Sequence, residues 1–179
     1  MRPVKAPPAR QGDAQRLHGL PPVLAPGARL LILGSFPGEA SLRAGQYYAH
    51  PRNQFWPLLS SLLGLDLVAM PYDARLQLMQ ARGLGLWDIY ASCRRQGSLD
   101  RAIVEPEFND FAWVRRQAPG LRVVGHNGGE SSRGARHLVA LGFECVRLPS
   151  TSPAHASWSL DRKQTAWRAL FVRCAIVAP

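Results

Sequence analysis

Two asparagines stand in segments whose composition suits a binding or catalytic site. Asn53 lies near the end of the stretch GSFPGEASLRAGQYYAHPRNQF, which covers residues 34–55, and Asn127 lies in GHNGG. A side-chain amide both donates and accepts hydrogen bonds, so it can hold a water molecule or the edge of a nucleobase. Either residue could instead cap a helix or form a turn. Two such amides in separate segments indicate a shared site more strongly than one would.

An aromatic pair, Tyr47 and Tyr48, precedes Asn53 in the same stretch. A tyrosine ring beside a groove can stack on a nucleobase, which contributes roughly 1–3 kcal/mol per base. The alternative for both rings is packing over the hydrophobic core. Phe55 and Trp56 have the spacing of core residues in a helix, and we expect them to be buried.

The start of the stretch is suited to a tight turn. Its sequence is Gly34-Ser35-Phe36-Pro37-Gly38. Glycine has no Cβ and proline fixes φ, so backbone amides in such a turn can approach a ligand closely. The segment matches neither the GxGxxG fingerprint of dinucleotide-binding folds nor the GxxxxGK[ST] phosphate loop. Taken alone, it could also be an ordinary turn.

A second polar loop lies in LPSTSPAHASWSL, residues 148–160. The hydroxyl groups of Ser150, Thr151 and Ser152, together with backbone amides, are suited to gripping phosphates, and Pro153 stiffens the loop. The alternative is a plain connector rich in serine and proline. His155 could contact a ligand or lie on the surface, and the sequence favours neither.

Four short apolar runs predict the strands that position these segments. They cover residues 30–33, 84–89, 121–124 and 144–148, and each is typical of a strand buried on both faces. Helical patterns alternate with them at residues 53–63, 72–81, 107–117, 131–141 and 160–176, the last introduced by Ser159 as a plausible N-cap. This alternation predicts an α/β fold of three layers, α/β/α, around a central four-stranded parallel sheet.

The predicted topology also brings the polar segments together. In an open parallel sheet, ligands bind beyond the carboxyl ends of the strands. The segments that follow the predicted strands are residues 34–52, 90–99, 125–129 and 149–155, so we expect them to converge on one site. Asp88, at the end of the second strand, could face that site. Asp100 could equally cap a helix.

The charge balance indicates an acidic polymer as partner. The chain carries 22 Lys and Arg against 12 Asp and Glu, a formal charge of +10, and nucleic acid is the first candidate. A solvated basic surface is the plainer alternative. Cys93, Cys145 and Cys174 form neither a CxxC metal pair nor a disulfide framework, so we expect no metal site and a reducing, cytoplasmic location.

Length and composition predict one folded domain and, before it, a separate N-terminal segment. The chain has 179 residues, of which 46% are hydrophobic, enough for one sizeable core. Residues 1–27 are rich in proline and arginine, and we expect them to be extended or disordered; they could still touch DNA. Residues 28–179 form the domain. Its apolar stretches are too short for a membrane span, and the N-terminus lacks the apolar core of a signal peptide.

Four segments, in one order, carry a resemblance to a known family. They are LILGSFPGEASLRAGQYYAHPRNQFWPLL, GLGLWDIYASCRRQGSLDRAI, VVGHNGG and LPSTSPAHA, within about residues 29–158. Together they resemble the uracil-DNA glycosylase superfamily, most closely its hypoxanthine-DNA glycosylase branch. The resemblance implies a parallel sheet between helices and a pocket that receives a damaged base flipped out of DNA. It also implies hydrolysis of the N-glycosidic bond without a metal or redox cofactor, by a monomer. The iron–sulfur branches need four cysteines, which three scattered ones do not supply.

The resemblance assigns the catalytic roles to two asparagines. Gly34 to Gly38 match the first motif, but Phe36 stands where the mismatch-specific uracil branch has a water-positioning Asn. The hypoxanthine branch lacks that Asn as well and relies on residues that match Asn53 and Asn127. An amide is no general base at neutral pH, so Asn53 would orient water while the cationic sugar attracts it.

The resemblance also assigns residues that hold the base and the DNA strand. Tyr48 matches the aromatic residue that stacks on the flipped base, and Pro149 to Pro153 match the motif that grips the strand. Leu148 stands where some branches open this motif with a histidine. The predicted base pocket comprises Ser35, Phe36, Pro37, Gly38, Tyr48 and Asp88, and the predicted DNA contacts are Arg52, Ser150, Thr151, Ser152, Pro153 and His155.

These observations predict a monofunctional DNA N-glycosylase of base-excision repair that acts on hypoxanthine first and uracil second. One alternative is a non-catalytic nucleic-acid-binding protein on the same scaffold, which the basic charge and the absent motif-one Asn favour. Another is a hydrolase of free nucleosides, for which so much arginine has little use.

Overall fold

A four-stranded parallel sheet forms the centre of the molecule. The structure is a computed structural model that describes residues 15–155 and 157–178. The strand order is β3-β2-β6-β7, where β2 is Leu30–Gly34, β3 is Leu84–Asp88, β6 is Val123–Asn127 and β7 is Glu144–Leu148. The predicted parallel sheet is therefore confirmed.

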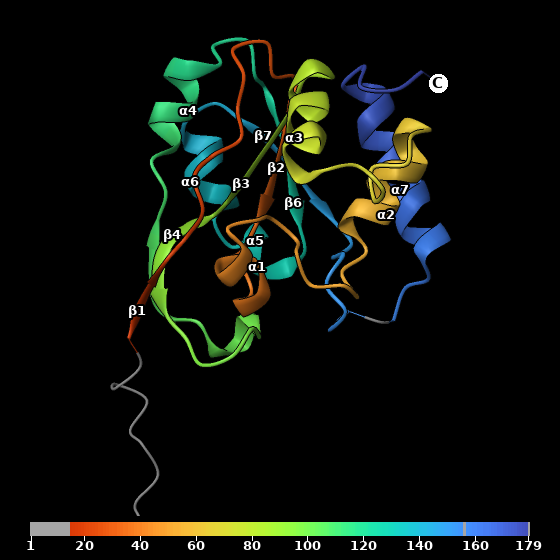
Figure 1. The fold of residues 1–179 in the computed structure, drawn as a ribbon. Coiled ribbons are helices and arrows are strands. Elements are labelled where there is room, and N and C mark those ends of the chain that lie inside the picture. Colours follow the sequence, from red (N-terminus) through yellow and green to blue (C-terminus); the bar gives the residue numbers. More distant parts are fainter. Residues whose placement is uncertain (1–14, 156, 179) are drawn as a thin grey trace, which may run out of the picture.

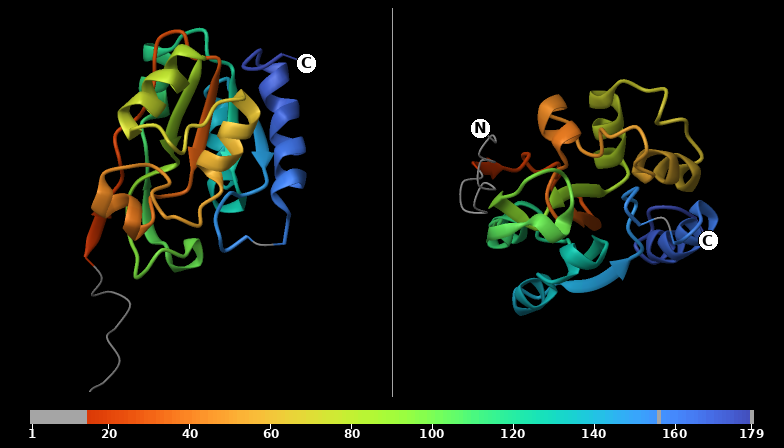
Figure 2. Two further views of the ribbon diagram at one scale, coloured as in Figure 1. Left: turned by 45° about the vertical axis from the view of Figure 1, so that its right-hand side comes forward. Right: turned by 90° about the horizontal axis from the view of Figure 1, so that it is seen from below.

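Helices cover both faces of this sheet (Figures 1 and 2). One face carries α2 (Phe55–Leu63), α3 (Tyr72–Ala81) and α7 (Leu160–Arg173), and the other carries α4 (Phe111–Gln117), α5 (Gly129–Ser132) and α6 (Ala135–Ala140). A short helix, α1 (Glu39–Ala44), lies beyond the carboxyl end of β2, at the lower end of the sheet in Figure 1. The three-layer α/β/α prediction is confirmed.

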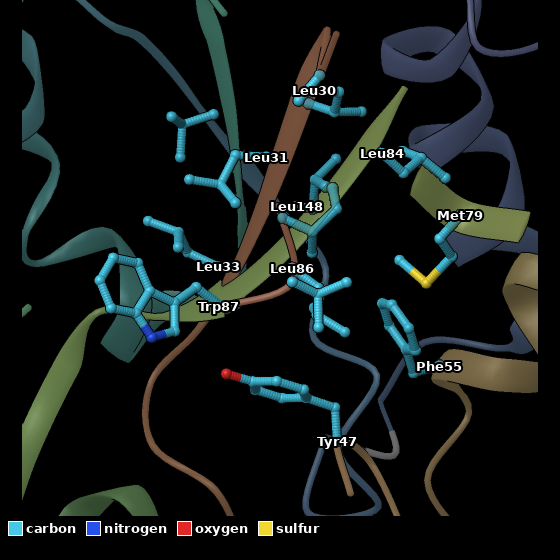
Figure 3. Packing of buried hydrophobic residues seen from close by; sticks show 14 of the residues in the cluster. Leu30, Leu31, Leu33, Tyr47, Phe55, Met79, Leu84, Leu86, Trp87 and Leu148 are labelled. Carbon is cyan, nitrogen blue, oxygen red and sulfur yellow. The ribbon is translucent and has the colours of Figure 1, made fainter. Parts of the chain in front are cut away.

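The hydrophobic core forms on both sides of β2. All five residues of β2 are buried, because its neighbours β3 and β6 pair with it and helices cover its two faces. Figure 3 shows Leu30, Leu31 and Leu33 of this strand among other core side chains. Strand β7 differs, since it is an edge strand with Glu144 and Arg147 exposed. The expectation that every strand is buried on both faces is therefore wrong for β7.

A second, antiparallel sheet was not predicted. It has the order β1-β4-β5, where β1 is Arg16–His18, β4 is Tyr90–Arg94 and β5 is Val104–Phe108. Strand β5 has the sequence VEPEF and is mostly exposed, so it lacks an apolar run that would reveal it. The predicted helix 107–117 is accordingly wrong at its start. Helix α4 begins at Phe111, where the side chain of Asp110 accepts a hydrogen bond from the Trp113 N–H at 3.0 Å.

The other helices form where predicted, but α2 begins at Phe55 and not at residue 53, α7 ends at Arg173 and not at residue 176, and one predicted helix is divided. The helix expected at 131–141 is two short helices, α5 and α6, separated at Gly134. A Cβ on Gly134 would lie 2.4 Å from Ile89 Cδ1, so close packing of this turn on β3's end requires glycine. Strand β6 begins and ends later than the predicted 121–124, and its last residue is Asn127.

Part of the N-terminal segment packs on the domain. Strand β1 pairs with β4, and the backbone of Val23 pairs with Leu86 of β3. The remainder of the predicted N-terminal segment, residues 1–14, lies outside the described residues. The division of the chain at residue 27 therefore stays a prediction. Among the described residues, no helix is both long and apolar enough to cross a membrane.

Candidate active site

A cavity of about 840 Å³ opens at the carboxyl ends of the parallel strands. Residues that follow all four strands line it, as expected for an open parallel sheet. Every predicted site residue except Arg52 contributes, namely Ser35, Phe36, Pro37, Gly38, Tyr48, Asn53, Asp88, Asn127, Ser150, Thr151, Ser152, Pro153 and His155. Arg52 is exposed and does not line the cavity. The volume suits one flipped nucleotide.

The last residue of β2 brings two strand ends close together. Gly34 pairs with Asp88 in the sheet register. A Cβ built on Gly34 would lie 2.3 Å from Asp88 Oδ1 and 3.3 Å from the Tyr48 hydroxyl oxygen. Only glycine leaves room there for both side chains. The carboxyl group and the phenol therefore meet at one wall of the cavity.

Tyr48 is held in an uncommon backbone conformation. Its φ is 55°, a left-handed value that costs a bulky residue of order 1–3 kcal/mol. The ring stacks on Phe55 with centroids 4.0 Å apart and 22° between the planes, and the hydroxyl accepts a hydrogen bond from Asn127 Nδ2 at 3.0 Å. Burial, and then the nearby Asp88, raise the pKa of Tyr48. The ring thus stands fixed and uncharged at the cavity.

Asn127 joins two walls of the cavity. Besides Tyr48, its Nδ2 donates to Thr151 Oγ1 at 2.9 Å, and its Oδ1 accepts from the Thr151 N–H at 2.9 Å. Both amide hydrogens are therefore engaged, and only the second lone pair of Oδ1 is left for a ligand. Asn127 is suited to positioning Tyr48 and the loop that contains Thr151 more than to direct contact with a base.

Asn53 both forms a turn and lines the cavity, which are the two roles that the sequence leaves open. Its Oδ1 accepts a hydrogen bond from the Phe55 N–H at 2.9 Å, which fixes the turn before α2. The same side chain lines the cavity, and among the described residues no protein group engages Nδ2. The amide is therefore oriented by the turn and retains one lone pair and two N–H donors for water or a base.

Asp88 is a buried carboxyl group without a hydrogen-bond partner on Oδ2. Only 4% of the residue is exposed, and none of the described residues bonds to Oδ2. Burial, and then the negative charge of Asp100, raise the pKa of Asp88 to about 8, although Arg95 opposes the shift. Burial therefore favours the protonated, neutral form of this carboxyl group. Asp100 is not a helix cap: it is the first residue of a short 3₁₀ helix, Asp100–Ala102, whose N-cap is Leu99. Its Oδ1 accepts a hydrogen bond from Ser35 Oγ at 2.6 Å.

The geometry agrees with what similarity to known proteins indicates. The sequence matches the family model described as Uracil DNA glycosylase superfamily over residues 21–171. The chain belongs to the uracil DNA glycosylase superfamily. A relative from Methanosarcina barkeri named "Hypoxanthine DNA glycosylase" is 39% identical over 156 residues, 87% of this chain and 98% of the relative. A relative of the same name from Methanosarcina acetivorans is 37% identical over 154 residues, 86% of this chain and 97% of the relative.

A solved structure agrees with the fold. An NMR structure of a protein described as a putative uracil DNA glycosylase, from Methanosarcina acetivorans, superposes with a TM-score of 0.81 and 34% identity. The match covers 90% of this chain and 99% of that chain. Membership in the superfamily confirms the predicted class of enzyme, a DNA N-glycosylase with damaged DNA as substrate, and does not favour the non-catalytic alternative. The roles of individual residues stay predictions.

Two buried cations of this glycosylase support the cavity loops, and neither was predicted from the sequence. Lys163 is 1% exposed, and its Nζ donates to Gln54 Oε1 at 2.7 Å and to the His155 carbonyl at 3.0 Å. Gln54 precedes α2, and His155 lies in the loop after β7. Lys163 therefore links the two loops that line the cavity. Arg95 donates to the Pro37 carbonyl and lies 5.1 Å from the centroid of the Phe36 ring, which fixes the turn after β2.

The sequence held a signal for Lys163. It stands on the buried face of α7, four positions before Trp167. A lysine on an otherwise apolar helix face needs polar partners inside the protein, and its partners here are the two loops of the site. Arg95 gave no comparable signal, because it directly follows β4, the central strand of the antiparallel sheet that the sequence did not reveal.

Proposed function

We propose that this protein removes hypoxanthine from DNA by flipping the base into the cavity and hydrolysing its N-glycosidic bond, which leaves an abasic site. The observation that supports this most is the meeting of a stacking ring, Tyr48, with two side-chain amides, Asn53 and Asn127, at one cavity. Two relatives that cover nearly the whole domain are named for the same base. Uracil is the second substrate to test. We further propose that the enzyme acts as a cytoplasmic monomer.

Binding would draw on stacking and on contacts with the DNA backbone. Extrusion of a base costs a few kcal/mol, and least for a mispaired base. Stacking on Tyr48 contributes roughly 1–3 kcal/mol toward that cost. The loop from Ser150 to Pro153, with His155, lines the cavity and would grip the phosphates on either side of the flipped nucleotide. Arg52 is exposed two positions before Gln54, whose N–H bonds to the Thr151 carbonyl, and it would add charge attraction.

The chemical step would rest on orientation and electrostatics. As the glycosidic bond stretches, positive charge grows on the sugar and negative charge on the base. Asn53, oriented by its bond to the Phe55 N–H, would hold the attacking water. Asn127 would keep Tyr48 and Thr151 in place. Such a mechanism needs no metal or redox cofactor.

Release of free base from a panel of duplexes tests this proposal. Each duplex carries a single hypoxanthine, uracil, xanthine or mismatched thymine, and released base is separated and quantified under single-turnover conditions. We expect hypoxanthine to be released fastest and uracil more slowly. Binding and shifting of hypoxanthine DNA without release of any base would favour the non-catalytic alternative. Faster release from free inosine than from DNA would favour a nucleoside hydrolase.

A further inference from the structure

We propose that Asp88 is the acid that protonates a purine as it leaves the sugar, which makes this cavity selective for purines. The inference rests on the proposed hypoxanthine release and adds a second catalytic group to it. Asp88 is the last residue of β3, it lines the cavity, and only 4% of it is exposed. The mechanism above makes no use of it.

The geometry around the carboxyl group favours its acid form. Oδ2 is buried and has no partner among the described residues. Oδ1 occupies the space beside Gly34 that a Cβ at that position would fill. A carboxylate in such a place lacks the donors that would stabilise its charge. A carboxylic acid is tolerated there, and none of the described residues takes its proton by a hydrogen bond to Oδ2.

The charged and titratable groups that face Asp88 come from several elements. Asp100, at the start of the 3₁₀ helix that follows β4, disfavours ionisation of Asp88. Arg95 favours ionisation, but less strongly than burial and Asp100 together oppose it. No ion pair joins Arg95 to Asp88, and Arg95 Nε and Nη1 also lack partners among the described residues. The other facing groups are phenols, Tyr47, Tyr48 and Tyr72. Burial raises the pKa of each of them, so they are uncharged at neutral pH.

The step balances without a further reactant. The Asp88 proton moves to the imidazole-ring nitrogen N7 of hypoxanthine. The bond between C1′ and N9 breaks with its electron pair going to the base, which departs as neutral hypoxanthine. Water then adds to C1′, and the proton it releases returns to the Asp88 carboxylate through solvent. A positioned acid contributes about 10²–10⁴-fold to such a step. Uracil has no N7, so it would gain nothing from this proton.

The test is the pH profile of single-turnover hypoxanthine release by the wild type and by Asp88→Asn. For the wild type we expect a rate constant that is level below about pH 7 and falls roughly tenfold per pH unit above an inflection near pH 8. Asp88→Asn still offers an N–H donor but no proton. It should be slower by at least ~10-fold at pH 6.5 and lack the inflection. The matched control is Asp73→Asn, an exposed aspartate on α3, which should follow the wild type.

A melting curve checks that the Asp88→Asn variant is folded. The pKa of Asp88 rises from 3.8 to about 8 on folding, so the wild type loses stability as pH rises from about 4 to 8. Asp88→Asn has no such loss and should melt at or above the wild-type temperature at pH 8. It should also bind a hypoxanthine duplex with a non-cleavable sugar within about threefold of the wild type, because its amide preserves the volume of the cavity.

The outcomes separate this inference from the proposed function. If the wild type releases hypoxanthine and Asp88→Asn has the same rate and the same pH profile, the acid role is overturned and the proposed function stands. A wild-type rate that stays level from pH 6 to 9.5 would overturn it without recourse to any variant. A wild type that releases no hypoxanthine at any pH would contradict the proposed function, and the acid role would fall with it.

Discussion

Replacing Asn53 with alanine is expected to slow single-turnover base release by at least ~10²-fold, the scale seen when one preorganised polar group is removed from an active site. The variant should remain folded and bind lesion DNA nearly as the wild type does. Its free energy of unfolding should fall by about 1 kcal/mol, because the Phe55 N–H loses its side-chain acceptor. Single-turnover release, binding and a melting curve, measured on the same preparation, provide the comparison.

Two further substitutions separate the water-holding role of Asn53 from its role in the turn. Asn53→Ser keeps an oxygen that can accept from the Phe55 N–H, so it should regain the stability but not the release. Asn53→Asp also keeps an acceptor, and its charge would favour the cationic sugar while it repels the departing base. Full activity of Asn53→Ser would make the residue a structural cap. The catalytic role would then pass to Asn127 or Asp88.

Replacing Asn127 with alanine is expected to reduce both release and stability. The change leaves the buried Thr151 N–H without its acceptor and the Tyr48 hydroxyl and Thr151 Oγ1 without their donor. An unpaired buried polar group costs about 1–3 kcal/mol, so we expect a loss of stability in that range. Release should fall by at least ~10²-fold, because Tyr48 and the strand-gripping loop would no longer hold their positions.

Tyr48→Phe is the matched control for that experiment. It removes one of the three Asn127 bonds and keeps the ring stacked on Phe55. We expect it to retain release within about tenfold of the wild type, since stacking and not the hydroxyl holds the base. If Asn127→Ala loses stability but releases base at the wild-type rate, Asn127 has a structural role and does not contribute to catalysis.

The central sheet and its cavity were predictable because each rests on a local signal. Short apolar runs marked β2, β3, β6 and β7, and the rule that ligands bind beyond the carboxyl ends of parallel strands sorted the loops. That rule placed Asn53 and Asn127 at one site although 74 positions separate them in the sequence. The paired glycine and proline of Gly34 to Gly38 marked the turn after β2.

Features that depend on long-range pairing were not predictable from local patterns. Strand β5 is polar and contains Pro106, so its residues read as a loop and the start of a helix. The hydrogen bond between Asn127 and Tyr48 joins residues 79 positions apart, and no local sequence pattern around either residue indicates it. The same holds for Asp88, because the absence of a partner for a carboxyl oxygen is a property of the folded interior and not of the sequence around it.

The proposed hydrolysis of the bond between deoxyribose and hypoxanthine leaves an oxygen atom from water on the sugar. It is tested most directly by a single-turnover reaction of a hypoxanthine duplex in water enriched in oxygen-18, with both products analysed by mass spectrometry. We expect free, unlabelled hypoxanthine and an intact DNA strand whose abasic sugar carries one oxygen-18 atom. DNA recovered with its hypoxanthine in place, or a strand broken at the lesion without incorporation of the label, would contradict it.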